Sequence, residues 1–347
     1  MTTYDDRLHF QTLYEQTPRQ FAFRAQTMEA WLAWQHAFRA ALRQHLGLAN
    51  LEADLRGYQP HAEREGTEDM GSYQREAWHL WVEPTVPLPY WLLRPKAQAG
   101  PLPLVLTPHG HNHPHIYVGI AYDERETESM QAGERDIAVQ AVLEGYLVIA
   151  PTARAFGETR TSQDRESGAV HSCRTQLLHD LLVGRTPIGD RVWDISRLID
   201  WALDTLNVDH RRIAITGNSG GGTISLFAAA CETRISVAVP SSYFNTFAGS
   251  IGSIYHCDCN YVPGILRLGE MYDVAGLTAP RAFCAIAGKD DPIFPIDCAR
   301  FAFEQLRRVY EVAGVPERCR LFEGHEGHRY YKSGSWPFIR EQFALIA

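Results

Sequence analysis

The chain has 347 residues, of which 45% are hydrophobic and 21% charged, as is typical of a soluble globular protein with a sizeable core. Its formal charge of −8 excludes the basic surface used to bind nucleic acid or anionic membranes. No apolar run approaches the roughly 20 residues that a membrane-spanning helix needs, so neither nucleic acid nor a membrane is an expected partner.

The cysteines and the first residues bear on the cellular compartment. Seven scattered cysteines, an odd number, argue against a disulfide framework. Residues 1–7 show neither the basic nor the apolar region of a secretory signal. We therefore expect a cytoplasmic protein. The sequence leaves its oligomeric state open, with a homodimer among the options.

The first third of the chain predicts a helix followed by paired strands. Apolar residues recur at three- and four-residue steps over 27–46, which predicts an amphipathic helix that ends near Gly47. The polar stretch 57–72 is expected to be a loop. Two extended runs, 73–82 and 86–94, then predict an antiparallel pair, and the prolines of the second run favour the sheet edge.

From residue 102 onward, predicted strands alternate with predicted helices, which indicates an α/β fold with a mainly parallel sheet covered on both faces. The strands are predicted at 102–107, 146–150, 212–216, 234–240, 281–288 and 319–323, and the helices at 135–144, 189–206, 223–231, 296–312 and 335–346.

Two connections, 152–188 and 241–278, are too long to be simple loops, so we interpret them as lid-like insertions over a site. The expected organisation is an N-terminal helical extension, residues 1–72, packed on a catalytic domain, residues 73–347.

One stretch carries the strongest chemical signal. The predicted strand at 212–216 breaks into Gly217-Asn218-Ser219-Gly220-Gly221, and a helix follows directly. Strand, tight Gly-x-Ser-x-Gly turn and helix form the context of a nucleophile elbow, which exposes a serine hydroxyl at the carboxyl edge of a sheet. Ser219 is the candidate nucleophile; an incidental serine in a glycine-rich turn is the alternative.

The ends of two later strands supply a candidate acid and a candidate base. Asp290 and Asp291 follow the strand at 281–288, and we choose Asp291 because the Asp-Pro turn points it back toward the sheet. The strand at 319–323 is followed by Gly324-His325-Glu326-Gly327-His328. His325 is the predicted base and His328 the second choice. Nucleophile, acid and base then stand in the chain order of α/β-hydrolases.

The loop after the strand at 102–107 reads Pro108-His109-Gly110-His111-Asn112. In that fold this loop supplies the second donor of an oxyanion hole. We therefore predict that the backbone N–H groups of His111 and Gly220 form the hole.

The chain resembles the α/β-hydrolase superfamily, and within it the bacterial esterases related to acetyl xylan esterases and dienelactone hydrolases. The resemblance runs from about Tyr73 to the C-terminus and rests on the motifs above, together with residues 153–158, 189–194 and 279–281. It departs from the relatives at Ala155, where they commonly carry glycine, and at Asn218, where histidine or glutamate is common. The resemblance implies the same roles for Ser219, Asp291 and His325.

The expected function is a serine carboxylic ester hydrolase that acts through an acyl-enzyme, without a cofactor. The resemblance favours short acyl groups, and aromatic walls suit acetylated carbohydrates or aryl esters. The residues expected to contact such a substrate are His109, Phe156, Phe244, Tyr255 and Phe294. An amidase or peptidase on the same triad stays open.

Two clusters could instead indicate a metal. His109, His111, His113 and His115 resemble the ligands of a metal-dependent hydrolase, but Gly110 and Pro114 interrupt any regular strand. The run His256-Cys257-Asp258-Cys259 is half a zinc site with no second pair at finger spacing. We therefore predict no metal site.

Overall fold

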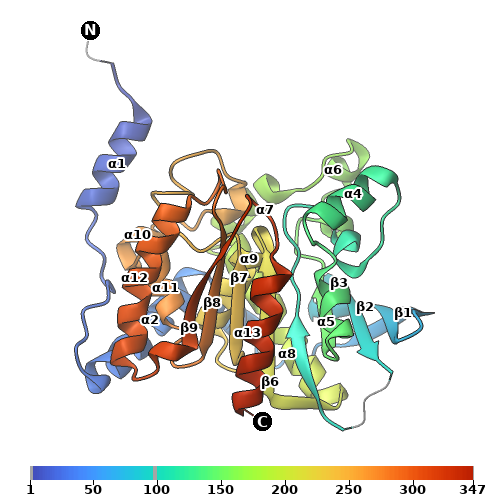
Figure 1. Ribbon diagram of the computed structural model, residues 1–347. Helices are drawn as coiled ribbons and strands as arrows, with labels where there is room; N and C mark the ends of the chain where they lie inside the picture. The colour runs from blue at the N-terminus through green and yellow to red at the C-terminus, as the bar shows by residue number, and fades with distance from the viewer. Residues whose placement is uncertain (1–2, 97–99, 347) are drawn as a thin grey trace.

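The computed structural model describes residues 3–96 and 100–346. Across these residues, nine strands form one sheet in the order β1-β2-β3-β5-β4-β6-β7-β8-β9 (Figure 1). Neighbours from β5 to β9 are parallel, and β1, β2 and β3 add an antiparallel end. The predicted α/β-hydrolase fold class is confirmed. Within the same residues, no helix is both long enough and apolar enough to cross a bilayer.

Every strand except β1 overlaps a predicted position. The strands are β1 Ala62–Asp69, β2 Tyr73–Glu83, β3 Val86–Pro95, β4 Leu102–Leu106, β5 Leu147–Pro151, β6 Val208–Asn218, β7 Val237–Ser241, β8 Ala282–Gly288 and β9 Cys319–Gly324.

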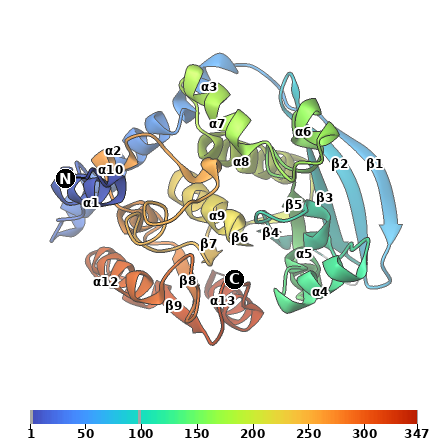
Figure 2. The same ribbon diagram turned by 90° about the horizontal axis from the view of Figure 1, so that it is seen from above.

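Helices cover both faces of the sheet, as the view from above shows (Figure 2). Helices α5 and α13 lie on one face, and α2, α8, α9, α11 and α12 lie on the other. The helices are α1 Asp6–Gln16, α2 Met28–His45, α3 Leu48–Asp54, α4 Glu124–Ala132, α5 Ile137–Leu143, α6 Ser162–Glu166, α7 Cys173–Leu182, α8 Pro187–Thr205, α9 Gly220–Cys231, α10 Ile265–Leu268, α11 Met271–Gly276, α12 Ile296–Val312 and α13 Lys332–Ile346.

The parallel strands β4, β5, β7 and β8 are almost entirely apolar because each buries both faces. In β4, Leu104 and Leu106 enter the core under α8 and α9, whereas Val105 enters the core under α5 and α13. This alternation follows from the two-residue period of a strand. Continuous apolar runs therefore identified the parallel strands correctly.

Two expectations at the N-terminal end of the sheet are wrong. Residues 62–69, within the predicted loop 57–72, form β1 and pair antiparallel with β2. The predicted edge strand β3 lies between β2 and β5 instead. It accommodates Pro87 and Pro89 because both precede the segment Tyr90–Leu93 that pairs with β5.

The two predicted insertions contain short helices. Residues 152–188 include α6 and α7, and residues 241–278 include α10 and α11. The N-terminal segment is helical in α1, α2 and α3 but also contributes strand β1. In α2, Phe38 and Leu42 are fully buried, as the periodicity predicts, and Gly47 adopts the left-handed conformation after the helix with φ of 85°.

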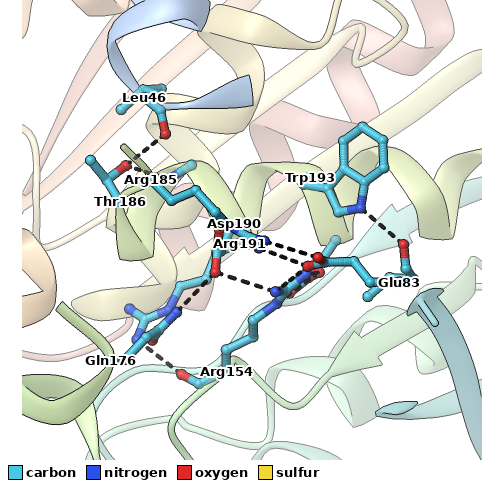
Figure 3. A network of polar contacts seen from close by, with 12 residues as sticks. Leu46, Glu83, Arg154, Gln176, Arg185, Thr186, Asp190, Arg191 and Trp193 are labelled. Atoms are coloured by element: carbon cyan, nitrogen blue, oxygen red, sulfur yellow. Dashed lines mark hydrogen bonds and ion pairs between the residues drawn. The ribbon is translucent and has the colours of Figure 1, made fainter. Parts of the chain in front are cut away.

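A buried ion network ties the loop after β5 to α8 (Figure 3). The Arg154 guanidinium donates to Asp194 through Nη2 at 2.6 Å and to Asp190 through Nη1 at 3.2 Å. Glu83, at the end of β2, binds both Arg154 and Arg185. The motif residues at 153–158 and 189–194 thus meet in one network. Ala155, next to Arg154, has a φ of 71°, a conformation that glycine adopts more readily.

We expect Arg154→Met to lower the free energy of unfolding by about 3–5 kcal/mol, because it leaves buried carboxylates without their shared cation. Urea unfolding measures the loss. The matched control is Arg307→Met, which breaks an exposed pair with Glu311 and is expected to cost less than about 1 kcal/mol. A loss for Arg154→Met as small as that of the control would contradict a stabilising role for the network.

Candidate active site

Ser219 lies on a strained turn between β6 and α9. Its backbone has φ of 56° and ψ of −115°, a region that a non-glycine residue rarely occupies. The Ser219 N–H donates to the carbonyl of Ser241 on β7 at 2.9 Å, which anchors the turn to the neighbouring strand. Strand, strained serine and helix are the geometry that the Gly-x-Ser-x-Gly pattern predicts.

The glycines around Ser219 allow the loop after β4 to approach the turn. A Cβ atom at Gly217 or Gly221 would lie 2.3 or 2.1 Å from the carbonyl oxygen of Pro108. A Cβ atom at Gly110 would lie 2.8 Å from the Asn218 carbonyl oxygen. Any side chain at these positions would separate the two loops, so the sequence pattern reflects backbone packing.

Asp291 follows β8 and is a fully satisfied carboxylate with an inaccessible side chain. Its Oδ1 accepts hydrogen bonds from the N–H groups of Ile293 at 2.9 Å and Phe294 at 3.1 Å. Its Oδ2 lies 2.8 Å from Nδ1 of His328. Asp290, the other carboxylate of this turn, is exposed.

The structure corrects the choice between the two histidines. The His325 side chain is 81% exposed and pairs with Glu326, so it does not reach Asp291. The His328 side chain is 19% exposed, holds Asp291 and stacks on Phe294 at a centroid distance of 5.8 Å. Because Asp291 accepts the Nδ1 proton, Nε2 of His328 is left as the basic nitrogen.

The path of the loop 324–328 explains why His328, and not His325, contacts Asp291. The loop runs back against β8, where the Gly327 carbonyl would lie 2.1 Å from a Cβ atom at Gly288. Tyr331 braces the loop, since its hydroxyl donates to the Gly327 carbonyl at 2.9 Å and accepts from the Glu326 N–H at 3.1 Å. His325 is thereby turned to solvent and His328 to the sheet edge.

The two residues that carry the predicted oxyanion donors, His111 and Gly220, are in contact. The imidazole of His111 lies so close to Gly220 that a Cβ atom there would be 2.9 Å from His111 Nδ1. Gly220 is the first residue of α9, where N–H groups have no partner within the helix. Burial opposes protonation of His111, but the sulfurs of Cys259 and Cys257 outweigh it and raise its pKa to about 10.

A cavity of about 410 Å³ brings these residues together. Ser219, Gly220, His111 and His328 all line it. Most of the other lining residues carry polar or aromatic side chains: Asn112, Arg135, His171, Asn218, Thr223, Tyr243, Tyr255, His256, Asn260 and Phe294.

The five predicted substrate contacts divide into two groups. Tyr255, which is 85% exposed, and Phe294 line the cavity. Phe244 instead packs on Phe283 in the core. Phe156 is buried against the rings of His109 and His111, behind the cavity wall. Neither of these two phenylalanines lines the cavity, which corrects their prediction.

His109 also lies behind the wall. Its Nε2 accepts the Ala153 N–H at 2.9 Å and its Nδ1 lies 2.6 Å from the Gly110 carbonyl oxygen. It thus joins the loops after β4 and β5, which corrects its prediction as a substrate contact. Burial lowers its pKa to about 3.

The four histidines at 109–115 do not converge on one point. His109 takes the backbone contacts above, His111 Nε2 lies 3.2 Å from Cys259 Sγ, and His115 Nε2 lies 3.0 Å from Glu126. The structure does gather a different set of metal-binding side chains, namely His111, Cys173, Cys257 and Cys259. Sequence reasoning missed this set because its members come from three separate segments.

Residues 65–248, more than half of the 347-residue chain, match the acetyl xylan esterase family AXE1. The chain belongs to this family. The match covers Ser219 and His111 and ends before Asp291 and His328. Membership of AXE1 makes the chain an enzyme of the carboxylesterase class, as predicted.

Individual relatives of this AXE1 chain are distant in sequence, and two solved structures share its fold. A candidate hydrolase of Bacillus subtilis, YtaP, is 24% identical over 247 residues, covering 69% of this chain and 77% of its own. A candidate acetyl xylan esterase of Bacteroides fragilis superposes with a TM-score of 0.78 at 16% identity, covering 97% of this chain and 84% of its own. A glucuronoyl esterase of Solibacter usitatus gives a TM-score of 0.67 at 14% identity, covering 95% and 97%.

Proposed function

We propose that the chain hydrolyses short-acyl carboxylic esters, such as acetylated carbohydrates or aryl acetates, through an acyl-enzyme on Ser219. The observation that carries the proposal is the Asp291–His328 hydrogen bond of 2.8 Å in the cavity that Ser219 also lines. This arrangement supports a nucleophile on the strained turn, with a base and an orienting acid from the loops after β9 and β8.

In the first half of the reaction, His328 Nε2 removes the proton of Ser219 Oγ as the oxygen attacks the ester carbonyl. Asp291 holds the imidazole in the required tautomer and stabilises the imidazolium. The N–H groups of Gly220 and His111 stabilise the oxyanion, and each such donor is typically worth about 3 kcal/mol. His328 then protonates the departing alcohol.

In the second half, a water molecule takes the place of the alcohol. His328 removes one of its protons, the resulting hydroxide attacks the acyl carbonyl, and the carboxylic acid leaves as Ser219 recovers its proton. Every step uses side chains and backbone groups of this chain.

The walls of the cavity support a polar substrate of modest size. Its volume of about 410 Å³ lies at the lower end of the range for small-molecule sites. Asn112 and Asn218 offer amide groups, and the exposed ring of Tyr255 provides an amphipathic surface. A sugar ester complements such walls because it carries both hydroxyl groups and apolar ring faces.

A panel of esters tests the proposal, with Ser219→Ala as the blank. It includes p-nitrophenyl acetate and octanoate, acetylated xylose, methyl glucuronate and an acetanilide. We expect the acetates to react faster than the octanoate and the anilide, and Ser219→Ala to lose at least about 10⁴-fold in kcat. A fluorophosphonate should add to Ser219 of the wild-type enzyme, as mass spectrometry of peptides would report.

Two results would overturn the proposal. One is a Ser219→Ala protein that hydrolyses the acetates at the wild-type rate. The other is a preference for methyl glucuronate or the anilide over every acetate, which would place the sugar on the acyl side or favour an amidase.

A further inference from the structure

Three cysteines and one histidine from distant parts of the chain meet at the wall of the active-site cavity, which His111 and Cys257 line. Cys173 begins α7 in the first insertion, and Cys257 and Cys259 belong to the second insertion. His111 belongs to the loop after β4. One ligand atom from each of the four lies within 4.8 Å of all the others.

The separations fit a tetrahedral zinc site. Zn–S bonds of about 2.3 Å and Zn–N bonds of about 2.0 Å place tetrahedral ligand atoms roughly 3.5–3.8 Å apart. The Sγ atoms of Cys257 and Cys259 are 3.5 Å apart, and His111 Nε2 lies 3.2 Å from Cys259 Sγ. All three cysteines are free thiols.

The surroundings also suit a metal thiolate centre. Cys173 and Cys259 are fully buried, and a buried thiol makes only weak hydrogen bonds. Arg191, on α8, is buried as well, and its Nη2 lies 3.7 Å from Cys173 Sγ. The Nε of Arg191 has no hydrogen-bond partner among the described residues. Its guanidinium thus offers positive charge and a free donor beside the sulfurs.

We propose that His111, Cys173, Cys257 and Cys259 bind one Zn²⁺ ion in a structural site. On binding, Zn²⁺ displaces three protons from the cluster to solvent, so that three thiolates and the lone pair of a neutral imidazole coordinate the ion. The centre then carries one net negative charge, which Arg191 balances. Four protein ligands leave no open position, so the ion is structural.

This site connects the three segments that shape the cavity. It ties both insertions to the loop that carries the predicted oxyanion donor, the N–H of His111. The ion thereby fixes the side chain of a residue whose backbone faces the reacting carbonyl. Zinc content is independent of hydrolysis, so this proposal can fail or succeed separately from the proposed function.

The test measures zinc in the untagged full-length chain, purified without chelator, by inductively coupled plasma mass spectrometry. We expect about one zinc ion per wild-type chain and at least a tenfold lower content in Cys173→Ser, Cys257→Ser and Cys259→Ser. Cys298→Ser is the matched control, since this half-buried cysteine lies outside the cluster, and it should keep the wild-type content.

A second measurement, made on the wild-type chain, tests the proposal even if the cysteine variants fail to fold. Wild-type chain exchanged with Co²⁺ should show thiolate-to-cobalt charge transfer and the strong visible bands of tetrahedral cobalt. Three results would overturn the proposal: a reduced wild-type chain that takes up neither metal, zinc retained by the cysteine variants, or a wild-type mass two hydrogens lower, with a disulfide mapped within the cluster.

Discussion

His328→Ala is expected to reduce kcat for p-nitrophenyl acetate by roughly 10⁵- to 10⁶-fold, whereas His325→Ala should stay within about twofold of wild type. The physical reason is the contact with Asp291, which lies 2.8 Å from His328 Nδ1, while His325 is 81% exposed and pairs with Glu326. Without His328, the site loses the imidazole that Asp291 orients.

The two histidines form a matched pair because they lie three residues apart in the same loop. Both variants should show melting temperatures near that of wild type, since neither side chain belongs to the apolar core. The loss for His328→Ala should appear in kcat, and fluorophosphonate labelling of Ser219 should slow in parallel. Equal losses for both variants would point to a general disturbance of the loop instead of a missing base.

The elbow could be predicted from sequence because its geometry is local. A buried strand, a glycine-flanked serine and an apolar helix are consecutive in the chain. Gly217 and Gly221 are required by close contact with Pro108, and Gly220 by close contact with His111. The parallel strands could also be predicted from the sequence, since a strand that is buried on both faces leaves a continuous apolar run.

The base could not be chosen from sequence with the same success. Both His325 and His328 follow β9, and position in the sequence favours His325, which is nearer to the strand end. The choice depends on how the loop folds back on Gly288 and on the brace from Tyr331. Those contacts are set by tertiary structure, and nothing in the spacing of the loop encodes them.

Strand β1 and the burial of two aromatic side chains also could not be predicted from the sequence. Residues 62–69 are mostly exposed and polar, so no hydrophobic alternation marks them, and backbone pairing with β2 makes the strand. Phe156 and Phe244 lie in the predicted insertions but turn into the interior. Whether an aromatic side chain lines a cavity or fills a core depends on the path of the whole insertion.

The cluster of His111 and three cysteines could not be predicted from the sequence because its members lie far apart in the chain. Cys257 and Cys259 gave half a site, and the other two ligands, Cys173 and His111, lie 84 and 146 residues before Cys257 (257 − 173 and 257 − 111). Metal-site patterns in sequence depend on short spacings, whereas this cluster is assembled from three connections at one edge of the sheet.

Asp291→Asn should lower kcat by about 10⁴-fold while leaving the fold intact. Oδ1 of Asp291 accepts two backbone N–H groups, those of Ile293 and Phe294. An asparagine keeps these bonds only with its carbonyl oxygen at the same position, so its NH₂ group must face His328 Nδ1. That nitrogen must then accept, which moves the imidazole proton to Nε2 and removes the lone pair that would deprotonate Ser219.

Two variants of Asp291 distinguish its two roles, which are to orient the imidazole of His328 and to stabilise the turn after β8. Asp291→Asn retains the turn and should unfold near the wild-type temperature, whereas Asp291→Ala loses both backbone bonds and should also be less stable. Asp290→Asn, the control on the exposed neighbour, should match wild type in rate and stability. If Asp291→Asn retained more than about a tenth of wild-type kcat, tautomer control by Asp291 would be wrong, and the Asp291–His328 bond would serve the fold instead of the reaction.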